Sequence, residues 1–196
     1  MPKMYIYGED GLTLKYTKEG LEEVLKKLED ESDPNECTVF FRPSFGRAQY
    51  GEFDAIIISQ QKAYLVEAKW DQSGDLSGGL REDQIRRHSI MKWFSQNWDG
   101  EKGDEWDQFA QRHNPEFKRT FKFVTKNGKS ETKYIPNSES RVGQNLQTIL
   151  TEIGDREIEN VLLIFYRDTP PKAEQEGFIT VYIKYDQTLN LFTELD

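Results

Sequence analysis

The stretch GEFDAIIISQQKAYLVEAKWD, residues 51–71, decides the fold of this chain. It holds two short apolar runs, at 55–58 and 63–66, on either side of a polar turn. Both runs are apolar at consecutive rather than alternate positions, which is typical of strands buried on two faces. We therefore predict a buried antiparallel hairpin at this point of the chain.

Carboxylates occur at one end of this hairpin only. If the hairpin is symmetric about its polar turn, Asp54 faces Glu67, and Glu52 faces Lys69. Directly opposed side chains have Cβ atoms roughly 5 Å apart, so the two carboxylates would repel each other. We expect a cation to offset this repulsion, while Glu52 and Lys69 can also be explained as a plain cross-strand ion pair.

Composition bounds the class of protein. The chain has 196 residues, enough for one α/β domain with a core of its own. A net charge of −9 excludes a general nucleic-acid coat but not an enzyme with one local basic patch. A single cysteine, Cys37, excludes a disulfide framework and a cysteine-based zinc site. The start lacks a signal peptide and no apolar run approaches about 18 residues, so we expect a cytoplasmic protein without membrane contact.

The remaining chain predicts alternating helices and strands. Hydrophobic spacing and turn signals indicate an N-terminal hairpin (4–7 and 12–16), helices at 17–30, 80–98 and 104–113, a helix to 153 capped by Ser138 or Ser140, and strands at 38–42, 161–166 and 178–184. The helix at 80–98 places Gln84 and Arg87 on its inward face, where polar groups need partners. This order predicts an α/β fold with a central mixed sheet flanked by helices.

A basic hairpin stands out in this acidic chain. Residues 117–125 and 129–135 flank Asn127-Gly128, a strong hairpin turn signal. Its basic residues include Lys118, Arg119, Lys122, Lys126 and Lys129. The hairpin is either an arm that contacts a nucleic-acid backbone or an ordinary solvated hairpin.

Asp54 and, after a gap of twelve residues, the run Glu67-Ala68-Lys69 resemble the core motif of the PD-(D/E)XK nuclease superfamily. This superfamily includes type II restriction enzymes, archaeal Holliday-junction resolvases and Mrr-like endonucleases. Its shared order of helix, three strands, helix and strand is similar to the order predicted here. Phe53 stands where the name-giving proline would be. The resemblance implies a restriction-endonuclease-like three-layer core in a single domain, 1–196, with the N-terminal hairpin at 1–16 and an insertion with the basic hairpin at 99–137.

The resemblance also implies roles for individual residues. Asp54 and Glu67 would bind Mg²⁺, or Mn²⁺ in its place, together with the backbone carbonyl of Ala68. Lys69 would be the catalytic lysine, and Gln84 resembles a glutamine that several of these families carry on the next helix. An acidic residue of the first helix often joins such sites, and Glu22 is the candidate here. Arg87 and the basic hairpin would contact nucleic acid.

The resemblance therefore implies a metal-dependent endonuclease acting on DNA, of the restriction, repair or recombination type. Mg²⁺ takes hard oxygen ligands and keeps several waters, so two carboxylates and a substrate phosphate suffice to hold it. Two alternatives stay open: an inactive nuclease-fold protein that binds or assembles, and an RNA nuclease, since nothing in the sequence distinguishes the sugars. Many such enzymes dimerise to cut both strands, so a homodimer also stays open.

Overall fold

The computed structural model describes residues 4–71, 79–98, 100, 105–124, 128, 130–185 and 192–195. The chain divides into two compact units. The first contains Met1–Pro43, Phe53–Arg81 and Arg156–Asp196, and the second contains Ser44–Glu52 and Glu82–Asp155.

The first unit is built on a five-stranded mixed sheet. Its strands are β2 (Thr38–Phe41), β3 (Ala55–Ile58), β4 (Lys62–Trp70), β7 (Glu157–Tyr166) and β8 (Ile179–Lys184), adjacent in that order. The first three pair antiparallel, whereas β4, β7 and β8 run parallel. The predicted α/β class with a mixed sheet is therefore confirmed, and each strand predicted for this sheet is present.

The central hairpin has the predicted register. Ala55 pairs with Val66, and the pairing continues to Ile58 with Ala63. All four residues of β3 are buried, as the continuous apolar run predicted. Strand β4 continues past the end of β3 as far as Trp70 and stays paired there with β7. Over the last residues of β4, none of the described strands pairs with its other edge.

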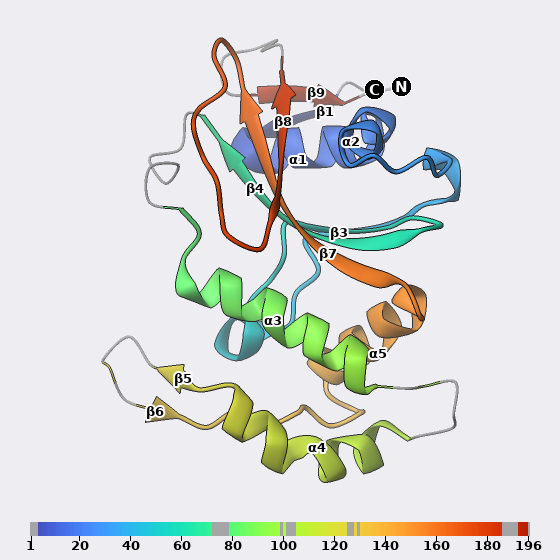
Figure 1. The fold of residues 1–196 in the computed structure, drawn as a ribbon, viewed down its shortest axis with the longest axis vertical. Coiled ribbons are helices and arrows are strands. Elements are labelled where there is room, and N and C mark those ends of the chain that lie inside the picture. Colours follow the sequence, from blue (N-terminus) through green and yellow to red (C-terminus); the bar gives the residue numbers. More distant parts are fainter. Residues whose placement is uncertain are drawn as a thin grey trace. The chain divides into compact units, whose positions relative to one another are not determined.

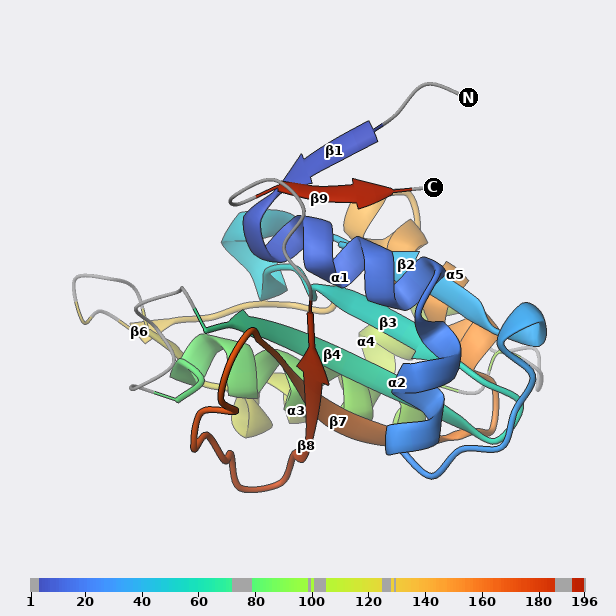
Figure 2. The same ribbon diagram turned by 90° about the horizontal axis from the view of Figure 1, so that it is seen from above.

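Two helices cover one face of this sheet: α1 (Gly8–Lys18) and α2 (Leu21–Lys27) (Figures 1 and 2). Leu12, Leu21 and Leu25 pack there against one core cluster that includes Val66 and Ala68 of β4. A 3₁₀ turn, η1 (Pro34–Glu36), follows α2.

The predicted N-terminal hairpin is wrong. Residues 12–16, predicted as a strand, belong to α1, and β1 (Met4–Tyr7) pairs instead with β9 (Phe192–Leu195) from the other end of the chain (Figure 2). The Gly-Glu-Asp-Gly segment, which was predicted as a turn, is the first turn of a helix. Acidic side chains in a first helical turn are favoured by the helix dipole, so Glu9 and Asp10 suit that place. The helix predicted at 17–30 is two helices, which meet at Gly20.

The second unit contains a π-helical turn, η2 (Gly46–Tyr50), the helices α3 (Glu82–Asn97), α4 (Trp106–Thr120) and α5 (Arg141–Ile153), and the short strands β5 (Phe123–Val124) and β6 (Ser130–Glu131). Its core is rich in aromatic rings. Trp93 of α3 makes edge contacts with Phe117 and Phe121, and stacking of Phe94 on Trp106 joins the same two helices. These large rings bury much area in a chain that is only 36% hydrophobic.

The basic hairpin is shorter than predicted. β5 and β6 pair antiparallel over two residues each, but Lys118 and Arg119 lie in the last turn of α4 rather than on a strand. Basic groups near a helix C-terminus are favoured by the helix dipole, which offsets the strand signal of the apolar residues around them. Lys126 and Lys129 lie outside the described residues.

Helix α5 begins as predicted from its capping signal. The Ser140 hydroxyl accepts a hydrogen bond from the Gly143 N–H at 3.0 Å, so Ser140 is the cap and Ser138 is not. Gly154, at a φ of 56°, ends the helix. Among the described helices, none combines the length and the apolar character needed to cross a lipid bilayer.

Candidate metal and nuclease site

Asp54 lies against the free edge of β4. Its backbone N–H donates to the Val66 carbonyl at 3.2 Å, and its Oδ2 accepts from the Ala68 N–H at 2.7 Å. These two contacts bracket Glu67 on the neighbouring strand. The carboxylate of Asp54 therefore takes the place that a further residue of β3 would occupy in the ladder.

The carbonyl of Ala68 points to the same edge. A residue in a strand directs its N–H and its C=O to the same side, and the Ala68 N–H points at Asp54. Ala68 itself is fully buried, so it offers backbone atoms and no side-chain chemistry. The carbonyl oxygen and the Asp54 carboxylate are thus neighbours on one edge.

Glu67 and Lys69 share the opposite face of the strand from Ala68. Side chains alternate along a strand, and Ala68 faces the core cluster beneath α1 and α2. Glu67 is only 1% exposed, an environment in which a carboxylate needs partners, whereas Lys69 is half-buried. Glu67 and Lys69 therefore lie on one face of β4, as predicted, and Glu67 is the more deeply buried of the two.

Glu9 on α1 joins this group, and sequence reasoning missed it. Its carboxylate accepts a hydrogen bond from the backbone of Trp70, two residues beyond Ala68 on the same edge of β4. Two successive edge positions of β4 are thus met by carboxylates, Asp54 at one and Glu9 at the next. The oversight follows from reading residues 8–11 as a turn. The usable signal was the pair of acidic residues at the start of a helix.

The electrostatics of Glu9 tie it to the predicted residues. Burial raises the pKa of Glu9 to about 7, and the charge of Asp54 acts in the same direction. The charge of Lys69 and the hydrogen bond from Trp70 act in the opposite direction. Asp54 and Lys69 are therefore close enough to Glu9 to influence its pKa.

Glu22 does not join this group. It lies on α2 and lines a surface hollow with Asp30, Glu31 and Asp33. The acidic residue of a helix that lies near Asp54 is Glu9, in the first turn of α1 and thirteen residues before Glu22.

Gln84 and Arg87 belong to the second unit. Both lie on α3, and both are buried at 6% exposure, as the inward position on the predicted helix required. Their participation with Asp54 and Glu67 stays a prediction. In the same unit, the Lys118 ammonium lies 3.7 Å from the centre of the Tyr134 ring, and Arg119 and Lys122 are exposed.

The donor set suits a hard cation with few protein ligands. Carboxylate and carbonyl oxygens are what Mg²⁺ prefers, and Asp54, Glu67, Glu9 and the Ala68 carbonyl are all of this kind. Within the residues that the structure describes, no three His, Cys, Asp or Glu side chains are grouped so as to hold a metal ion. The fit to Mg²⁺ thus depends on one or two carboxylates with a backbone oxygen, the remaining positions being water or phosphate.

Comparison of the chain with protein-family models, with curated proteins and with solved structures found no match.

Proposed function

We propose that this protein is a metal-dependent endonuclease that hydrolyses phosphodiester bonds in DNA, with a restriction-endonuclease-like core. The observation that carries the proposal is the edge of β4, where Asp54 and Glu9 accept hydrogen bonds from the backbone N–H groups of Ala68 and Trp70, on either side of Lys69. The order of the first unit supports it as well: a helix, three antiparallel strands and a parallel strand after a crossover resemble that core.

Asp54, Glu67 and the Ala68 carbonyl would hold Mg²⁺, and Glu9 would be an acidic neighbour of Asp54. When bound, the ion supplies charge to offset the phosphate and lowers the pKa of water. The ammonium of Lys69 is the one cationic group assigned to this centre. It would hold the attacking water and stabilise the negative charge that develops on the phosphate oxygens.

Plasmid and branched DNA, incubated with Mg²⁺ or Mn²⁺ and compared with an EDTA control, test the activity. The wild type should cleave only with metal, and Lys69→Ala should slow cleavage by about a hundredfold or more, since loss of one charge-stabilising donor typically costs that much. Equal rates for the wild type and Lys69→Ala would reject the role of Lys69. Inactivity on these substrates and on single-stranded RNA would reject the proposal, whereas cleavage of RNA alone would reassign the substrate.

Glu9 has a matched control in the chain. Glu9→Gln should reduce cleavage about tenfold or more and weaken Mn²⁺ binding in calorimetry, because it removes a carboxylate beside Asp54. Glu22→Gln makes the same change on α2 and should leave both quantities unchanged. Equal effects of the two variants would contradict the assignment of Glu9.

One observation favours a second function, a nuclease-fold protein that binds but does not cleave. It is the absence of a three-ligand group among the described residues. Mn²⁺ calorimetry separates the two functions: a nuclease should bind the ion and lose that binding in Asp54→Asn. A non-cleaving binder should show no heat that depends on Asp54.

A further inference from the structure

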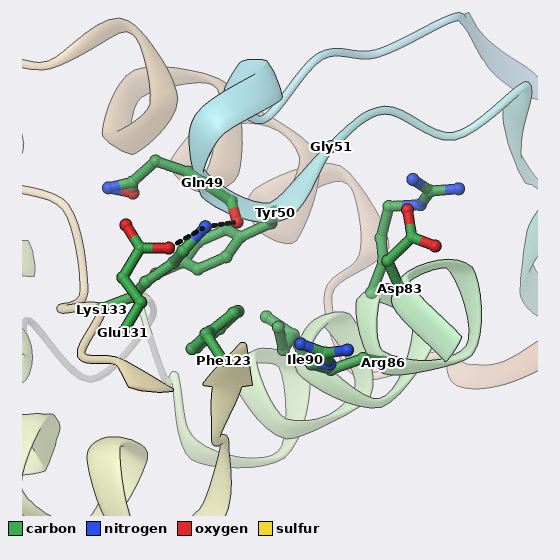
Figure 3. A pocket seen from close by; sticks show the side chains of 10 residues that line it. Gln49, Tyr50, Gly51, Asp83, Arg86, Ile90, Phe123, Glu131 and Lys133 are labelled. Atoms are coloured by element: carbon green, nitrogen blue, oxygen red, sulfur yellow. Dashed lines mark hydrogen bonds and ion pairs between the residues drawn. The ribbon is translucent and has the colours of Figure 1, made fainter. Parts of the chain in front are cut away.

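A pocket in the second unit is lined by charged side chains that have no role in the proposed cleavage step. It has a volume of about 160 Å³, several times the ~30 Å³ that one water occupies in the liquid. Figure 3 shows its lining from η2, α3 and the short β5–β6 hairpin. Three cationic residues line it, Arg86, Arg87 and Lys133, against two carboxylates, Asp83 and Glu131. This local excess of positive charge occurs in a chain of net charge −9.

Two of these cations meet at a single aromatic ring. The guanidinium carbon of Arg86 lies 5.5 Å from the centre of the Phe123 ring, and the Lys133 ammonium lies 4.8 Å from the same centre. The ring's negative face attracts each cation, but the two cations repel each other. Since both cations contact this ring, it is poorly placed to stack on a nucleobase.

Lys133 is held in place by the pocket wall. Its Nζ donates to the backbone carbonyl of Gln49 at 2.7 Å and lies 3.7 Å from a carboxylate oxygen of Glu131 (Figure 3). Its side chain is only 13% exposed. Burial lowers the pKa of Lys133, the charge of Arg86 lowers it further, and Glu131 opposes both. The ammonium therefore sits where an additional negative charge would be favourable.

Gly51 makes room for the third cation. A side-chain Cβ at this position would lie 2.6 Å from Nη1 of Arg87, and the backbone has a φ of 89°. Arg87 is nine-tenths buried, so its guanidinium is fixed rather than free in solvent. Planar guanidinium groups at fixed positions suit the oxygens of a phosphate.

We propose that this pocket binds a phosphate group, with Arg86 and Lys133 as its principal cationic contacts and Arg87 fixing the wall beside them. The ligand is a phosphate ester of a nucleic-acid strand or a free phosphate. The volume admits a phosphate group, and the occupied face of Phe123 disfavours a base.

The test measures binding by the full chain in EDTA, so that it does not depend on cleavage. The probes are inorganic phosphate, thymidine monophosphate and a short single-stranded oligonucleotide. Arg86→Gln should weaken the binding of each probe that binds by about tenfold, the loss expected for one charge-assisted hydrogen bond. Arg141→Gln removes the same charge from an exposed position in the same unit and should change binding less than twofold.

Each outcome decides the proposal. Equal weakening by the two variants would show general attraction and overturn it, and so would failure of the wild type to bind any probe. Tighter binding of the oligonucleotide than of the two small probes, with the same sensitivity to Arg86→Gln, would assign the phosphate to a strand. Because Arg86→Gln could also disturb folding, NMR of the Lys133 side chain in the wild type gives a second readout. Phosphate should raise the pKa of Lys133, and an unchanged titration would overturn the proposal.

Discussion

The carboxyl group of Glu9 is largely buried and lies near two residues of opposite charge, Asp54 and Lys69. Single residues of this kind are hard to find from sequence, because their role depends on which helix brings them to the sheet. The positions of Asp54, Glu67 and Lys69 could be predicted because their spacing within one hairpin fixes them, whereas their roles stay predictions. Glu9 lies in a separate element, and only the fold brings it to that hairpin.

The raised pKa of Glu9 predicts a pH dependence of stability. Between about 4.5 and 7 the folded protein holds a proton that the unfolded chain has released, so the free energy of unfolding should fall as the pH rises through this window. The loss should reach at most about 3 kcal/mol above pH 7. Urea unfolding of the wild type and Glu9→Gln in EDTA checks this. The variant should lack this part of the slope, Glu22→Gln should keep it, and parallel curves for all three would refute the shift.

Gly51 is the second residue whose substitution tests the geometry. Gly51→Ala should lower the free energy of unfolding by about 2 to 4 kcal/mol, because it combines a positive φ with a close approach to Arg87. Gly177→Ala is the control, since its φ of 77° is similar and nothing among the described atoms lies within 4 Å of the added Cβ. It should cost only about 1 kcal/mol. Equal losses in thermal unfolding would mean that Arg87 moves aside without cost.

At the scale of elements, the sequence predicted a helix or strand correctly where several local signals indicated the same structure. The hairpin of β3 and β4 has buried apolar runs, a polar turn and a symmetric register, and all three agreed. The N-terminal segment carried conflicting signals, since alternating apolar residues at 12–16 suit a strand while α1 buries Leu12 against the sheet. Packing of α1 against the sheet favours the helix over the strand, and packing between distant segments cannot be predicted from a local sequence pattern. The prediction of the basic hairpin was partly wrong for a similar reason, because α4 extends into the first half of the strand predicted at 117–125.

The cap of α5 gives a test at this scale. Ser140→Ala should lower the free energy of unfolding by about 1 kcal/mol, because it removes the acceptor for the Gly143 N–H. Ser138→Ala is the matched change two residues away, where the hydroxyl bonds the exposed Asp107 carboxylate. That loss should be smaller, about 0.5 kcal/mol, since solvent replaces an exposed hydrogen bond. Chemical denaturation of both variants checks the order, and a larger effect at Ser138 would contradict the assignment of the cap.

At the scale of the whole molecule, residues distant in sequence form the first unit. β1 begins the described chain and pairs with β9 at its end, and the Lys15 ammonium of α1 donates to the Glu194 carbonyl at 3.3 Å. Such pairing between segments nearly the whole chain apart has no local signature, which is why sequence reasoning placed β1 in a local hairpin. The helix that carries Glu9 is thus linked to the C-terminal strand.

Removal of β9 should therefore affect the proposed site from a distance. A chain ending at Tyr185 should lose several degrees of thermal stability, as β1 and α1 lose contacts with Phe192–Leu195. Its Mn²⁺ binding should also weaken, because α1 positions Glu9. A protein that keeps its wild-type melting temperature and metal binding after this truncation would contradict the link.

The unequal lengths of β3 and β4 have a consequence for how such a centre arises. The edge of a sheet normally leaves its backbone groups to water, but here two acidic side chains from separate segments accept hydrogen bonds from Ala68 and Trp70 of β4. The proposed centre therefore lies at the sheet edge beyond the end of β3, and not on the face of the sheet. Extending β3 by one residue would pair the Ala68 backbone with another strand residue and displace the Asp54 carboxylate from it, so the difference in strand length positions an acid of the proposed site.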